Sequence, residues 1–96
     1  MAVLHTNIMP YKYAYQAAAA QDVVVKASPG FLHGIVVGAI VSGGTIAVSD
    51  HATDGEGNIC VYFIPSVAGT YIFDMNFETG ITANQYKPTN ITYIYY

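Results

Sequence analysis

Charge is what this sequence has least of. Only nine of its 96 residues are charged, namely three lysines and six acidic residues, and there is no arginine. Average domains carry charge on about a quarter of their residues. Proteins bind nucleic acids mainly through Lys and Arg side chains that release counterions from phosphates. Because the net charge is −3 and Lys12, Lys26 and Lys87 are far apart in the sequence, we expect no nucleic-acid partner.

Cysteine is almost absent too. Cys60 stands alone, which excludes an intrachain disulfide, and its place in the strand-like residues 59–63 predicts a buried, inert thiol. The histidines His5, His33 and His51 are not spaced as zinc ligands usually are. No serine or cysteine lies in a nucleophile motif. We therefore predict no catalytic residue, no metal site and no cofactor.

Long hydrophobic runs are also missing. The longest, residues 31–41, is interrupted by His33, Gly34 and Gly38 and is far shorter than a membrane span. The first residues have neither a basic region nor an apolar stretch of signal-peptide length. We expect a protein that is made in the cytoplasm, is not secreted and has no membrane partner.

Hydrophobic residues, by contrast, make up 53% of the chain, and nine residues are tyrosines. A surface with so few charges is weakly protected against self-association. The composition predicts that part of the surface is buried in an assembly, as a homo-oligomer or with a protein partner.

Two-residue periodicity is clearest in residues 70–78. The apolar face holds Tyr71, Phe73, Met75 and Phe77, and the other face holds Asp74, Asn76 and Glu78 with Ile72. Because side chains alternate across a strand, this pattern predicts a half-buried antiparallel strand. We expect Val23, Val25, Ile46 and Val48 to complete the core.

Turn residues punctuate the chain at short intervals. Residues 28–30 (SPG) are strong turn chemistry, and residues 42–44 (SGG) predict a tight hairpin. About seven or eight short strands result, which is the spacing of an all-β, antiparallel β-sandwich or jelly-roll-like domain. We place this domain at residues 21–96. Residues 1–20 are predicted to be an N-terminal arm that pairs with a neighbouring subunit, or an edge strand.

A polar loop at residues 50–58 is the one candidate for ion binding. It contains Asp50, Asp54 and Glu56, whose carboxylates are suitable Ca²⁺ ligands. Ala52 occupies a position at which the calcium-loop pattern needs a ligand. We favour a solvated hairpin tip, because loop backbone is normally solvated.

Five short motifs in a fixed order carry a resemblance to a known group of proteins. They are SPGFL (28–32), IAVSD (46–50), GTY (69–71), FETGI (77–81) and NITYIY (90–95). Together they resemble small β-sandwich virion proteins of tailed bacteriophages. The resemblance implies a structural virion protein, most simply a capsid decoration or cement protein that binds the major capsid protein or other virion proteins. The alternative it leaves open is a tail, neck or fibre module that recognises a host glycan or another virion protein.

Tyrosines near the two ends are the candidate interface residues. Their amphipathic rings suit surfaces that are partly apolar and partly wet, but tyrosine is also a good strand former that can line a sandwich. We assign the interface to Tyr11, Tyr13, Tyr15, Tyr93, Tyr95 and Tyr96.

Overall fold

The computed structural model describes residues 10–18, 21–53 and 58–96, and within them it contains eight strands and no helix. The strands are β1 (Lys12–Gln16), β2 (Gln21–Lys26), β3 (Gly30–Ala39), β4 (Thr45–Asp50), β5 (Asn58–Phe63), β6 (Gly69–Phe77), β7 (Ile81–Tyr86) and β8 (Thr89–Tyr95). The predicted all-β class is confirmed.

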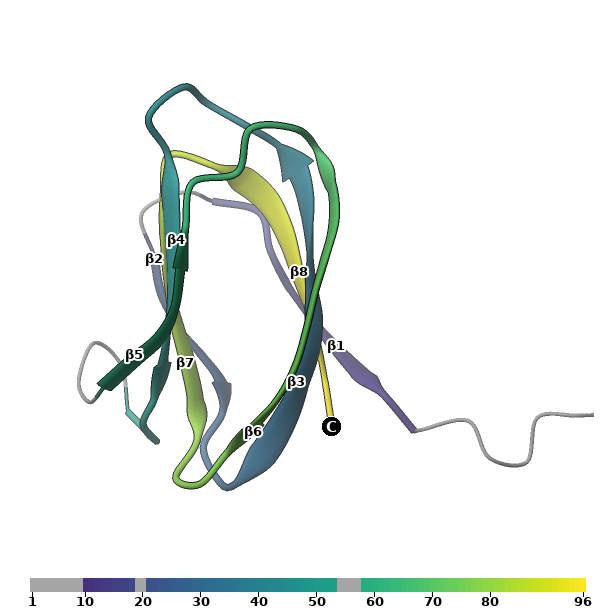
Figure 1. Cartoon of the computed structure of the whole chain (residues 1–96), viewed down its shortest axis with the longest axis vertical. Helices are drawn as coiled ribbons and strands as arrows, with labels where there is room; N and C mark the ends of the chain where they lie inside the picture. Colours follow the sequence, from purple (N-terminus) through teal and green to yellow (C-terminus); the bar gives the residue numbers. More distant parts are fainter. Residues whose placement is uncertain (1–9, 19–20, 54–57) are drawn as a thin grey trace, which may run out of the picture.

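The strands form two antiparallel sheets that face each other (Figure 1). One sheet has the order β1-β8-β3-β6 and is called the β1 sheet below; the other has the order β2-β7-β4-β5 and is called the β2 sheet. Among the described strands, β4 and β5 are the one consecutive pair within a sheet, and every other connection crosses from one sheet to the other. The predicted small β-sandwich is confirmed.

The turn at residues 42–44 shows how local chemistry misleads about pairing. The chain does reverse there, since Gly43 has a φ of 79° and Gly44 N donates to Val41 O at 2.9 Å. The flanking strands β3 and β4, however, belong to different sheets. The predicted hairpin is wrong, because turn residues determine a reversal of the chain but not which strands then pair.

Strand β6 has the alternation that its sequence predicts. Phe77 is buried, whereas Tyr71, Phe73 and Met75 are half-buried and pack against the core. The alternate residues 70, 72, 74 and 76 are exposed. The inward side chains are only half-buried because β6 is the edge strand of its sheet.

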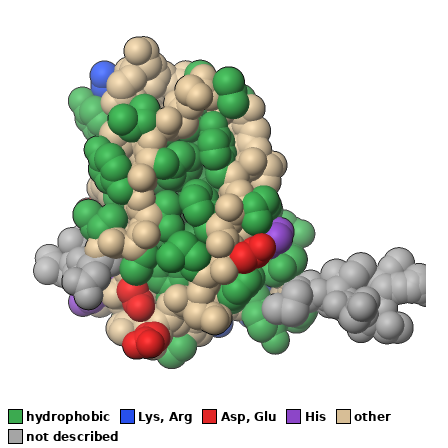
Figure 2. Space-filling view, in the orientation of Figure 1, with side chains coloured by type: hydrophobic (Ala, Val, Ile, Leu, Met, Phe, Trp, Pro, Cys, Tyr) green, Lys and Arg blue, Asp and Glu red, His purple; other side chains and the backbone are tan. Residues whose placement is uncertain are grey.

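The edges of β5 and β6 lie on the same side of the sandwich, toward the viewer in Figure 1. Phe63 of β5 contacts two rings of β6 here, with centroid distances of 5.0 Å to Tyr71 and 5.5 Å to Phe73. In Figure 2, hydrophobic side chains are visible between the two sheets on this side, and charged side chains occupy only a few places.

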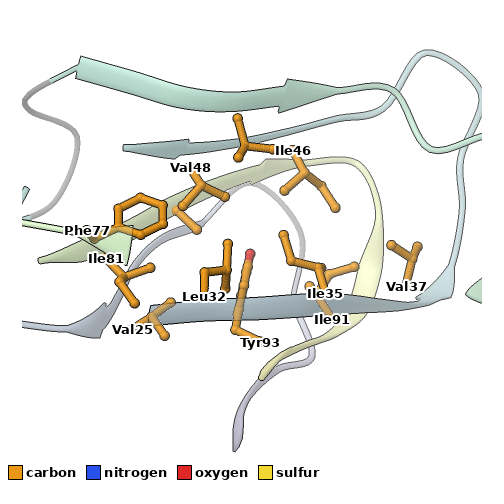
Figure 3. Close-up of a cluster of buried hydrophobic side chains, with 12 residues drawn as sticks. Val25, Leu32, Ile35, Val37, Ile46, Val48, Phe77, Ile81, Ile91 and Tyr93 are labelled. Atoms are coloured by element: carbon orange, nitrogen blue, oxygen red, sulfur yellow. The ribbon is translucent and has the colours of Figure 1, made fainter. Parts of the chain in front are cut away.

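The core fills the space between the two sheets (Figure 3). Among the residues predicted for it, Val25, Ile46 and Val48 are buried and Val23 is half-buried against them. The buried hydrophobic side chains are Val25, Leu32, Ile35, Val37, Ile46, Val48, Val61, Phe77, Ile81, Ala83, Ile91 and Tyr93.

A polar bridge crosses this core. Tyr93 of β8 donates its hydroxyl hydrogen to Gln85 Oε1 of β7 at 2.8 Å, and both residues have no exposed surface. Gln85 Nε2 in turn donates to Ala18 O at 2.8 Å. The bridge joins the two sheets to the segment that links β1 with β2. Because each buried polar atom has a partner, the bridge avoids the cost of desolvating an unpaired group.

The first described residues form an edge strand of the chain's own sheet. β1 pairs with β8 in antiparallel register from Lys12 opposite Tyr95 to Gln16 opposite Ile91, and Ala14 packs against the core. The alternative expectation, an arm that pairs with a neighbour, is therefore wrong for these five residues. Of the other residues covered by that expectation, 1–9, 19 and 20 lie outside the described part of the chain.

Candidate interaction surface

The outer face of the β1 sheet presents a column of tyrosines. Because alternate residues of a strand point to opposite faces, Ala14 points inward and Tyr13 and Tyr15 point outward. Their side chains are 67% and 63% exposed, which leaves most of each ring available to a partner. The Tyr15 hydroxyl donates to Asn90 Oδ1 at 2.7 Å, so this ring is held in place at the surface.

Uncharged side chains continue this surface across the sheet. Tyr13 lies opposite Ile94, and Ile94 and Ile72 both lie opposite Gly34 of β3, one from each side. A Cβ on Gly34 would lie 3.0 Å from Ile72 Cδ1, so the glycine lets this isoleucine lie across the sheet. We call this surface the tyrosine face, and it comprises Tyr11, Tyr13, Tyr15, Val36, Thr70, Ile72, Thr92 and Ile94.

Asp74 lies beside the tyrosine face and belongs to a small cluster at its end. His33 Nδ1 lies 2.6 Å from Asp74 Oδ1, and the Tyr11 ring stacks on the imidazole at a centroid distance of 4.5 Å and an interplanar angle of 16°. The Tyr11 hydroxyl is 3.3 Å from the same nitrogen. Because the rings are nearly parallel, that hydroxyl lies above the imidazole plane, outside the direction of its N–H or lone pair. The N–H of His33 Nδ1 therefore donates its hydrogen bond to the Asp74 carboxylate. The stacking on the imidazole holds the Tyr11 ring in place.

Irregular backbone creates this cluster. The registers of β3 with β6 and with β8 both shift between Leu32 and Gly34, which leaves His33 at a bulge. Opposite it, Asp74 has a φ of 51°, a left-handed conformation that aspartate tolerates better than most residues. The sequence does not predict this left-handed conformation, because Asp74 fits the two-residue alternation of β6.

The C-terminal tyrosines of the predicted interface do not join this surface. Tyr93 points into the core and has no exposed surface, so its assignment to an interface is wrong. Burial also raises the pKa of its hydroxyl. Tyr95 points to the same side of β8 and packs against the core. Tyr96 is 44% exposed and lies at one end of the sandwich, where Tyr96 N and O are hydrogen-bonded to Phe31. Of the six predicted tyrosines, the structure thus brings together Tyr11, Tyr13 and Tyr15.

The Asp50 carboxylate accepts hydrogen bonds from the backbone of the turn between β6 and β7. Its Oδ2 accepts from Glu78 N at 3.0 Å, and its Oδ1 accepts from Thr79 N at 2.8 Å and from Gly80 N at 3.3 Å. These backbone donors lower the pKa of the Asp50 carboxyl below its ordinary value. The carboxylate holds the turn between β6 and β7. The other two acidic residues of the predicted ion site lie in residues 54–57, outside the described part.

Histidine and cysteine do not gather into a reactive site in the described residues. His51 Nδ1 accepts a hydrogen bond from Thr53 N at 3.1 Å within its own loop, and His33 lies on the opposite sheet. Cys60 is exposed on the edge strand β5, so the expectation of a buried thiol is wrong. No group of three His, Cys, Asp or Glu side chains that could hold a metal ion occurs in residues 10–18, 21–53 and 58–96.

Sequence reasoning missed the approach of two lysines. Lys12 begins β1 and Lys26 ends β2, and both strand ends lie at the same end of the sandwich, where the two side chains line one open groove. Lys87 follows β7 at the opposite end, since Lys26 is paired with Ile81 at the start of that strand. The sequence could not predict that Lys12 and Lys26 lie near each other. Their approach arises because β1 and β2 pair within different sheets, which brings the start of β1 and the end of β2 to the same end of the sandwich.

No protein-family model, curated protein or solved structure matches this chain. No helix long and apolar enough to cross a membrane occurs among the described residues. The resemblance to phage virion proteins therefore stays a prediction.

Proposed function

We propose that this protein is a structural subunit of a tailed-bacteriophage virion, acting as a capsid decoration protein that binds the shell through the tyrosine face. The observation that carries the proposal is the composition of that face. Two mostly exposed tyrosines continue into aliphatic and threonine side chains, and the charged Asp74 beside them is paired with His33 at the end of the face. Surfaces of this kind are typical of interfaces, whose centres are rich in tyrosine and poor in charge.

The rest of the molecule agrees with a role in assembly. Large hydrophobic side chains with at least 40% exposure occur on both sheets and at both ends of the sandwich, including Val24, Ile40, Val67 and Tyr96. A free monomer would present this surface to water. Contact with neighbouring subunits buries it, and the hydrophobic effect then supplies the binding energy without a cofactor.

Particle composition tests the virion role. Purified particles from the phage that encodes this chain should contain it in a fixed ratio to the major shell protein, measured by quantitative mass spectrometry. Particles that lack the chain would refute the proposal. A position on the tail instead of the shell, seen by labelling and electron microscopy, would point to the alternative of a tail-associated binding module.

A matched pair of substitutions tests the tyrosine face itself. Tyr13→Lys places a charge in the proposed interface, whereas Tyr62→Lys changes the same residue type at 61% exposure on the β2 sheet. We expect the first variant to be lost from particles and the second to be retained, with both folded by circular dichroism. Equal retention of both variants would show that the tyrosine face is not the contact.

A further inference from the structure

A groove lies beside the two lysines. It has a volume of about 800 Å³ and lies at the end of the sandwich where β1 begins and β2, β6 and β8 end. This volume is in the range of pockets that hold drug-sized ligands. The side chains that matter for its chemistry are Lys12, Lys26, Phe31, Asn76, Phe77 and Tyr96.

An apolar floor and a glycine shape the groove. Phe77 is buried beneath it, and Phe31 is half-buried beside it. A Cβ on Gly30 would lie only 2.7 Å from Lys26 Cδ and 3.3 Å from Lys26 Nζ. The absence of a side chain at Gly30 therefore allows the Lys26 side chain, including its ammonium group, to lie against Gly30, which also lines the groove.

Both charged side chains that line the groove are lysines. Two of the three lysines of the whole chain line it, although the net charge of the protein is −3. Among the described residues, the one ion pair joins His33 to Asp74, so no described carboxylate is paired with Lys12 or Lys26. Nearby cations over an apolar surface attract an anion and favour one that also carries an apolar group.

We propose that this groove binds a carboxylate that is carried on an apolar body. The carboxylate lies between the ammonium groups of Lys12 and Lys26, and the apolar part covers Phe31 and Phe77. Two sources share this chemistry: a free aryl or alkyl acid, and a glutamate flanked by apolar residues in a partner protein. The site goes beyond the assembly role and is separate from it, because the groove is at the end of the sandwich and the tyrosine face is on the outside of the β1 sheet.

Titration of the full chain with small probes, followed by ¹H–¹⁵N NMR, tests the site. The free-acid probe is 4-phenylbutyrate, with the neutral 4-phenylbutanamide as its control. The peptide probe is acetyl-Leu-Glu-Leu-amide, with the glutamine peptide as its control. We expect saturable shifts at the amides of Gly30, Phe31 and Phe77, with a dissociation constant of about 0.1–1 mM for a ligand of this size.

Lysine variants supply the decisive comparison. Replacing both Lys12→Gln and Lys26→Gln should weaken binding of the acid about five-fold or more, because the attraction comes from these two charges. Lys87→Gln is the matched control, since Lys87 lies at the opposite end of β7, and it should leave binding unchanged. The tighter of the two acidic probes shows whether the groove prefers a free acid or a glutamate side chain.

Three results would overturn the inference. They are the absence of saturable shifts for both acids at up to about 10 mM, equal binding of the acid and its neutral control, and unchanged binding by the double lysine variant. None of them affects the proposed shell contact, which is tested by Tyr13→Lys.

Discussion

Removal of one buried hydroxyl should measure the strength of the bridge between the sheets. Tyr93→Phe deletes the group that donates to Gln85 Oε1 at 2.8 Å, in a place without access to water. The phenylalanine ring fills nearly the same volume, so no large cavity forms. The cost is then mainly that of leaving the amide oxygen of Gln85 without a partner, which is about 1–3 kcal/mol.

Chemical and thermal unfolding give the measurement. For a domain of this size, each kcal/mol lowers the midpoint of thermal unfolding by about 4–8 °C. Tyr95→Phe is the control, because Tyr95 is next on the same side of β8, and its hydroxyl has no hydrogen bond among the described residues. We expect the control to cost less than about 0.5 kcal/mol, as substitutions away from buried networks usually do.

The comparison can refute the reasoning directly. If the two variants lose the same stability, the Tyr93 hydroxyl is not bonded in a buried site and the bridge does not hold the sheets. If Tyr93→Phe is more stable than the parent, the cost of burying the polar pair exceeds its hydrogen-bond energy.

Other predictions concern the core, the acidic turn and the first strand. Phe77→Ala should cost about 3–5 kcal/mol because Phe77 is buried, and Phe73→Ala should cost less because its ring is half-buried; equal losses in urea melts would contradict the burial of β6. Asp50→Asn should destabilise the fold at pH 7, and the difference from the parent should shrink as the pH falls below about 4. The folded carboxyl has the lowered pKa, so its contribution is present above the unfolded pKa and is lost as acid protonates it; an unchanged difference at pH 3 would count against the turn contacts. Deleting residues 1–16 should lower the unfolding midpoint strongly, because it removes β1 and exposes the edge of β8, whereas deleting residues 1–9 keeps all eight strands and serves as the control; equal midpoints would show that β1 adds nothing.

The sequence predicts this fold well where the signal is local and repeated. The alternation of β6 assigns Phe77 to the core and Asp74 to the surface because the two-residue period of a strand operates within one segment. The same rule places Tyr13 and Tyr15 on a common face. Strand number and class follow from the turn residues between such segments.

Pairing between distant segments is what local patterns do not contain. Tyr93 and Tyr95 have the same alternation as Tyr13 and Tyr15, yet they face inward, since an alternating strand has two faces and both of them carry large side chains in β8. The central position of β8, between β1 and β3, decides that its tyrosines fill the core. The prediction of a hairpin at residues 42–44 fails for a related reason, because this turn joins strands of different sheets.

Sites built at strand ends are the least visible in the sequence, and the two lysines illustrate why. Lys12 and Lys26 are separated by a crossing from the β1 sheet to the β2 sheet, so their approach depends on the topology of the whole sandwich. In a chain with only three lysines, placing two of them beside an apolar groove gives one end of the molecule a chemistry that the rest lacks. The tyrosine face has almost no charge and so relies on buried area, whereas the groove has charge to orient a ligand. A subunit with both surfaces can therefore make a broad contact through one and a selective contact through the other.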